Sequence, residues 1–226
     1  IIGKEAFKAC ESLTSVTLGK GITEVAEGVF ESCYSIGSVT MTKGVISLGK
    51  SAFRGCYSLK RVTFSDTLTT IGEDCFRGCM ALENVEIPKS VTEIGEGAFA
   101  NCKSIVSIAI PDGVTAIKLT TFEGCAKLSS VKLPDGLTVI EDVAFFGCVS
   151  LTSIDFNAKL TTIKKAAFWN SGLTKVNIPD NVTTVEARTF VNCPITSVRL
   201  PKNLAGFEAE VFYNCTKLEY IETALS

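Results

Sequence analysis

Phenylalanine recurs at an almost constant interval along the whole chain, and this periodicity constrains the fold more than any other feature. The first seven intervals are 23 residues long and the last two are 22. The ten repeat phenylalanines, which number the copies one to ten, are Phe7, Phe30, Phe53, Phe76, Phe99, Phe122, Phe145, Phe168, Phe190 and Phe212. The sequence therefore predicts a single domain, residues 1–226, of about ten repeats of 22–23 residues.

Each copy divides into two segments with different apolar spacing. The stretch Leu128–Leu133 ends in an alternation of apolar and polar residues, which predicts a short strand with Val131 and Leu133 facing inward. Pro134 then ends the strand, because proline cannot donate to a sheet ladder. The stretch Gly97–Cys102 places Ala98, Phe99 and Cys102 three to four residues apart, which predicts one helical or 3₁₀ turn with one buried face.

A single copy cannot fold alone. Ordering its backbone costs about 1–2 kcal/mol per residue, whereas each apolar side chain returns only about 1.5–3 kcal/mol on full burial. Neighbouring copies must supply the remainder by stacking, with each strand paired in parallel to the next at about 4.8 Å. Because strands and turns occupy different widths, we expect the stack to curve, with the strands on the concave side and the turns on the convex side.

The motif Ile-Gly-x-x-Ala-Phe-x-x-Cys-x-x-Leu-x-x-Val-x-Ile-Pro, nearly intact from Ile94 to Pro111, resembles the 23-residue BspA-like class of leucine-rich repeat proteins. The resemblance covers essentially the whole chain. It implies an α/β solenoid: a right-handed superhelix with a concave parallel β-sheet and short helical, 3₁₀ or irregular turns on the convex side. It also implies a cell-surface or secreted protein, since members of this class are typically surface proteins and several are adhesins.

The sequence departs from that pattern in three respects. The glycine after the leading isoleucine is replaced in the later copies, and copies eight and nine are each one residue shorter. We also recognise no cap, secretion signal or wall anchor at either end. The residues in place of the glycine are Lys118, Glu141, Lys164, Glu186 and Glu208.

Nine of the ten cysteines follow a repeat phenylalanine by three residues, so we expect them to form a ladder of reduced thiols in the core. Adjacent positions are close enough for disulfides, but their Cβ vectors run side by side. Ser171 holds this position in copy eight, and a serine can replace a packing thiol but not half of a disulfide.

Cys75 is the one cysteine outside the ladder. It is read as a small core residue, and the alternative, metal chelation with Cys79, lacks two further ligands.

Composition argues against several classes of function. The chain has no histidine, which removes Ser–His and Cys–His catalytic pairs and His-containing zinc sites. Its net charge is −2, so it lacks the excess of basic residues that binds nucleic acid. No apolar run is long enough to span a bilayer. Nucleotide-binding fingerprints are also missing, and the acidic residues, such as Glu73 and Asp74, are typical of a solvated face. We therefore expect no enzyme activity, no catalytic residues, no metal and no cofactor.

Two strand positions in each copy are expected to face the concave side. The first row precedes the inward Val or Ile, and the second row follows it. The early copies carry mainly Ser and Thr, whereas the second row becomes charged from Lys132 onward. We predict a partner-binding site at Lys132, Asp155, Lys175, Asn177, Arg199 and Tyr220, because Arg and aromatic side chains dominate binding hot spots. The alternative is that these charges only keep an exposed sheet soluble.

A further row directly follows each repeat phenylalanine. It is polar or small through copy six and becomes apolar at Phe146, Trp169, Val191 and Tyr213. This change predicts a second, convex contact patch, such as a dimer face or a docking surface for a flanking domain. The alternative is that the shortened later copies tilt these side chains into the core.

The leading interpretation is a non-enzymatic scaffold that binds a host or microbial surface protein, with carbohydrate as an alternative ligand. A structural spacer without a ligand site is the competing function. Two sequons, at Asn181 and Asn214, matter only in a eukaryotic secreted protein. The sequence does not determine the oligomeric state.

Overall fold

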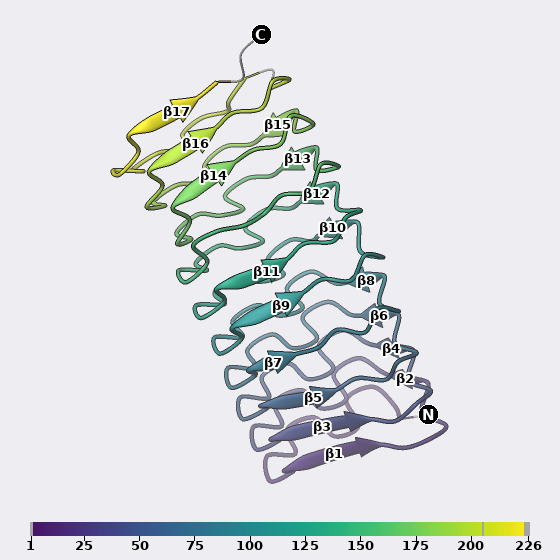
Figure 1. The fold of residues 1–226 in the computed structure, drawn as a ribbon. Helices are drawn as coiled ribbons and strands as arrows, with labels where there is room; N and C mark the ends of the chain where they lie inside the picture. Colours follow the sequence, from purple (N-terminus) through teal and green to yellow (C-terminus); the bar gives the residue numbers. More distant parts are fainter. Residues whose placement is uncertain (1, 205, 224–226) are drawn as a thin grey trace.

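In the computed structural model, which describes residues 2–204 and 206–223, the ten copies stack as successive coils along one axis (Figure 1). One face carries the longer strands, and we call it the sheet face. Its first sheet pairs six strands in parallel, in the order β1 (Ser15–Leu18), β3 (Ser38–Met41), β5 (Arg61–Thr63), β7 (Asn84–Val85), β9 (Ser107–Ala109) and β11 (Ser130–Lys132). A second sheet on this face pairs β14 (Lys175–Asn177), β16 (Ser197–Arg199) and β17 (Tyr220–Glu222).

A second ladder of two-residue strands runs beside the sheet face (Figure 1) and was not predicted from the sequence. Each of these strands contains the leading Ile, Leu or Val of a copy, and that side chain is buried. The strands form two four-stranded parallel sheets, the first of β2 (Glu24–Val25), β4 (Ser47–Leu48), β6 (Thr70–Ile71) and β8 (Glu93–Ile94), the second of β10 (Ala116–Ile117), β12 (Val139–Ile140), β13 (Thr162–Ile163) and β15 (Thr184–Val185).

The predicted helical or 3₁₀ turns are not found: the described residues contain no helix, and the segments around each repeat phenylalanine are irregular turns. In all ten copies, the residues two before and two after the phenylalanine have positive φ, as at Ser51 and Gly55 around Phe53. This alternation directs every second amide to the next coil. Phe53 N donates to Cys75 O at 2.9 Å, and Gly55 N donates to Arg77 O at 2.8 Å. Hydrogen bonds between coils thus replace those along a helix.

The core is a column of stacked rings beside a ladder of thiols. Successive repeat phenylalanines lie 5.2–5.8 Å apart between ring centroids, with nearly parallel planes. All ten cysteines are free, and eight of the nine cysteines of the predicted ladder are buried, as is the extra cysteine, Cys75. In eight copies the thiol also donates to the phenylalanine carbonyl of the preceding copy, as Cys79 Sγ does to Phe53 O at 3.3 Å. Cys10 differs from the prediction. It is exposed and lies in the first coil of the described chain.

Glycine after the leading isoleucine is required where two coils approach most closely. A Cβ added to Gly72 would lie 2.7 Å from the carbonyl carbon of Gly49, closer than real side chains approach backbone. We therefore expect Gly72→Ala to lower the free energy of unfolding by about 1–3 kcal/mol, because the coils must separate locally. Lys164→Ala is the matched control at the same repeat position, where a side chain is already accommodated, and should change it by less than about 0.5 kcal/mol. Equal losses in urea unfolding would contradict the close approach.

Candidate functional site

The sheet face is interrupted at copy seven. Residues 153–156 form no strand, although the flanking copies provide β11 and β14, so the face divides into two sheets (Figure 1). In the described part of the chain, the backbone groups of these four residues take part in no hydrogen bond. The side chain of Asn157 supplies one replacement contact, donating through Nδ2 to Pro134 O at 2.7 Å. The interruption leaves backbone donors and acceptors free at the middle of the face.

Beside this interruption lies a hollow of about 340 Å³. Five of the six residues predicted to bind a partner line it, and Lys132 lines a different hollow centred on β9. The wall residues come from copies seven to ten, and parallel register sets their order across the strands. The hollow is lined by Ser153, Ile154, Asp155, Lys175, Val176, Asn177, Ser197, Val198, Arg199, Tyr220 and Glu222.

Register places the polar groups of this hollow in two lines. Lys175 is level with Ser197 and Tyr220, and Asn177 is level with Arg199 and Glu222. Between the two lines lie Val176 and Val198, whose side chains are buried in the core, so the backbone of β14 and β16 forms the floor of the hollow. Tyr220 is 59% exposed at the open end of the sheet.

Arg199 is less available than the sequence indicated. Its guanidinium donates to Ile178 O at 3.2 Å and to Asp180 Oδ1 at 2.9 Å. Desolvation favours the protonated form of Asp180, but hydrogen bonds from Arg199 and from the amide of Lys202 outweigh it, and the pKa of Asp180 is lowered. Arg199 therefore helps to fix the loop after β14. By contrast, the side chains of Asp155, Lys175, Asn177, Tyr220 and Glu222 make no hydrogen bond or ion pair within the described residues.

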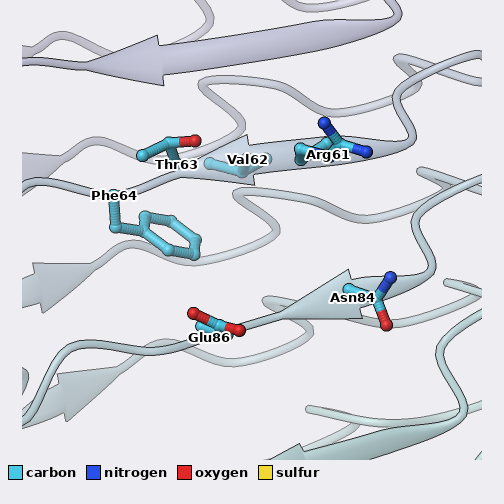
Figure 2. Close-up of a pocket in the computed structure, with 6 residues that line it drawn as sticks. All are labelled: Arg61, Val62, Thr63, Phe64, Asn84 and Glu86. Carbon is cyan, nitrogen blue, oxygen red and sulfur yellow. The ribbon is translucent and has the colours of Figure 1, made fainter.

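Sequence reasoning missed a second interruption, between β5 and β7. These strands share one register pair, Arg61 with Asn84, and a hollow of about 340 Å³ opens beside it (Figure 2). Phe64 lies at the end of β5, where other copies carry an aliphatic residue such as Leu18 or Leu133. Phe156 occupies the same place in copy seven, 92 residues later, beside the first interruption. The repeated substitution was the signal available in the sequence.

The convex row of predicted contact residues is not uniformly exposed. Val191 is buried, Phe146 and Trp169 are half-buried, and Tyr213 is 62% exposed. The rings of Phe146 and Trp169 meet edge to face at 5.7 Å. The indole Nε1 of Trp169 is covered and has no acceptor among the described residues. In the early copies the same row carries ion pairs, such as Lys8 with Glu31 at 3.0 Å.

The described residues contain neither a cluster that could hold a metal ion nor a helix that could span a membrane. No group of three or more Cys, Asp or Glu side chains there is arranged to hold a metal ion. Cys75 and Cys79 are both fully buried in the core. Residues 2–204 and 206–223 include no helix able to cross a membrane. The amide of Asn214 donates to Asn192 Oδ1 at 2.7 Å, and that of Asn181 to Ala158 O.

This geometry of parallel coils around a phenylalanine column is that of a leucine-rich repeat protein. The chain belongs to the BspA-type leucine-rich repeat family, whose model, with six copies of the repeat region, matches residues 1–106 and 92–219. No significant match was found among curated proteins.

Several solved structures share the fold. A leucine-rich repeat protein from Bacteroides ovatus is 31% identical with a TM-score of 0.91, and the match covers 98% of this chain and 58% of that protein. The chain thus spans little more than half of that relative. A leucine-rich repeat protein from T. pallidum is also 31% identical, with a TM-score of 0.66 over 69% of this chain and 75% of that one. A leucine-rich cell surface protein from Faecalibacterium prausnitzii is 23% identical, with a TM-score of 0.60 over 95% of this chain and 88% of that one.

Proposed function

We propose that the chain is a non-enzymatic protein-interaction scaffold that binds its partner on the sheet face of copies seven to ten. The observation that carries this proposal is the hollow beside the copy-seven interruption, where side chains of both charges and an exposed tyrosine have no partner of their own. The equivalent rows of copies one and two carry only Ser and Thr. Chemical contrast of this kind is what a repeat scaffold needs to select a partner.

We further propose that the partner is a host or microbial surface protein and that the chain is the adhesive region of a cell-surface or secreted protein. Support for the location comes from the family resemblance. Support for a protein partner comes from the size of the surface, which extends over four copies, and from the exposed ring of Tyr220 beside polar side chains, since interfaces are enriched in aromatic residues and have polar rims.

The test compares two pairs of first-row substitutions. Lys175→Ala with Tyr220→Ala removes a cation without a partner in the described chain and an exposed ring, and should weaken partner binding at least about tenfold, because tyrosine is a typical binding hot spot and the lysine charge is available to an acidic group of the partner. Ser15→Ala with Ser38→Ala is the matched control at the same row and should bind like the unmodified chain. Arg199 is left unchanged, because its loss would also release Asp180.

The partner is captured by a photo-crosslinking residue placed at position 177, with position 40 as the equivalent control in copy two. Solubilised surface proteins of epithelial cells and of other bacteria serve as the probe. We expect one crosslinked product from position 177 that disappears in the Lys175→Ala, Tyr220→Ala chain. Equal labelling from both positions, or labelling from neither, would favour a structural spacer instead.

A further inference from the structure

The hollow between β5 and β7 is formed by residues of copies three and four. The ring of Phe64 extends toward copy four (Figure 2). It meets the ring of Phe76 edge to face, with ring centroids 5.8 Å apart. Beyond the pair of Arg61 with Asn84, the two strands no longer pair. Phe156 meets Phe168 in the same way at 5.8 Å, beside the copy-seven interruption. Both interruptions thus lie beside a phenylalanine, which is bulkier than the leucine found at this place in copies one and six.

The walls of this hollow have two polar ends. Arg61 and Asn84 lie together at one end, and Thr63 and Glu86 lie at the other, about 6.6 Å further along the strands (Figure 2). Among the described residues these four side chains make no hydrogen bond or ion pair. The side chain of Val62, between the two ends, is buried, so the apolar surface of the hollow comes from the half-buried ring of Phe64. One positive and one negative group leave the hollow without net charge.

This combination suits a neutral ligand with many hydroxyl groups. A guanidinium, an amide and a carboxylate are planar groups that present paired donors or acceptors, and each hydroxyl can both donate and accept. The accessible part of the Phe64 ring can receive the C–H face of a sugar ring. A strongly charged ligand would meet the like charge of either Arg61 or Glu86.

We propose that the hollow between β5 and β7 is a saccharide-binding site that takes one or two rings of a neutral glycan. Its volume of about 340 Å³ lies in the range of small-molecule sites. The site is formed by copies three and four, and the proposed protein-binding surface is formed by copies seven to ten. Because the two sites share no residue, saccharide binding and protein binding can each be tested when the other is absent.

The experiment follows the amide NMR spectrum of the full chain during titration with lactose, cellobiose or diacetylchitobiose. We expect at least one of them to give saturable shifts at millimolar concentration, in the backbone amides of Val62 and Thr63 and the side-chain amide of Asn84. Added salt should leave the affinity unchanged, because the ligand is neutral. Arg61→Ala should weaken binding about tenfold or more, whereas Ser15→Ala, at the same row two copies away, should not.

Phe64→Leu tests the origin of the site without removing a polar group. It installs the residue found at this place in copies one and six, so the chain should retain its fold and its circular dichroism spectrum. Saccharide binding should nevertheless be lost, because β5 and β7 can then pair fully. The proposal is overturned if none of the three disaccharides gives saturable shifts, or if Arg61→Ala leaves them unchanged. Salt-sensitive binding of a mixed-charge peptide in place of every sugar would also overturn it.

Discussion

Raising the pH above about 9 is expected to destabilise the folded chain steeply, because folding buries nine thiols. Burial raises the pKa of the Cys56 and Cys125 thiols from the ordinary value of 9.0 to about 12, and that of Cys193 to about 11. The unfolded chain therefore loses these protons first, and the folded chain binds more protons throughout that interval. Stability is complete below the pKa of the unfolded thiols and is lost progressively as the pH rises toward about 12.

The size of this effect follows from the number of thiols. A thiol whose pKa is raised from 9.0 to about 12 removes about 4 kcal/mol of stability in total, and this full loss is reached only when the pH exceeds the pKa of the folded thiol as well. Since domains are typically stable by about 5–15 kcal/mol, a few such thiols are enough to unfold the chain. We expect the midpoint of urea unfolding to fall with each step in pH above about 9.

Serine provides the matched variant for this measurement. Ser171 already occupies the thiol position in copy eight, where it is buried and contacts Cys193 Sγ at 3.2 Å. Cys125→Ser with Cys148→Ser replaces two thiols by hydroxyls that do not titrate in this range. The slope of the free energy of unfolding against pH measures how many more protons the folded chain binds than the unfolded chain. In the variant this difference should be smaller by about two protons, so stability should fall less steeply with pH. An unchanged slope would show that other groups, such as exposed lysines, cause the alkaline loss.

The stacking of copies was predictable because it depends on periodic features. A phenylalanine, a cysteine and an alternating strand recur in every copy, so the inward and outward positions follow from spacing alone. The turns were not predictable in this way. Residues such as Val143 and Arg188 rarely adopt positive φ, yet they do so here. Hydrogen bonds to the neighbouring coil, which no local pattern reveals, outweigh the preference of the single residue.

The candidate site was predictable only in part, for a related reason. Row assignment placed Asp155, Lys175, Asn177 and Tyr220 on one face, and in the structure they line one hollow. The strand interruption beside this hollow coincides with an exception to the repeat, Phe156 in place of an aliphatic residue. Likewise, the engagement of Arg199 by Asp180 joins two copies across 19 residues of sequence, outside the reach of a motif. At both interruptions the sheet face opens beside a residue that breaks the repeat pattern, Phe64 in copy three and Phe156 in copy seven.

Phe99→Ala is expected to cause one of the largest losses of stability available to a single substitution in this chain. Phe99 is fully buried at the middle of the phenylalanine column, 5.5 Å from the Phe76 centroid and 5.8 Å from that of Phe122. Removing a buried phenylalanine typically costs about 3–5 kcal/mol, since it leaves a cavity and removes the packing on both sides. Phe7→Ala is the control. Phe7 is 43% exposed and has one neighbour in the column, Phe30, so its loss should cost about 1 kcal/mol.

The two variants should also differ in the form of unfolding, because each coil of a repeat stack contacts only its neighbours. A gap at Phe99 weakens the coupling of copies one to four with copies six to ten, whereas a gap at Phe7 affects one end. Trp169, the single tryptophan, reports on copy eight by fluorescence, and circular dichroism reports on the whole chain. In Phe99→Ala we expect the two probes to give separate urea transitions, and in Phe7→Ala to coincide. If the probes coincide in both variants and the losses are equal, the column does not couple the two halves, and their cooperativity must come from the hydrogen-bonded ladders that run beside it.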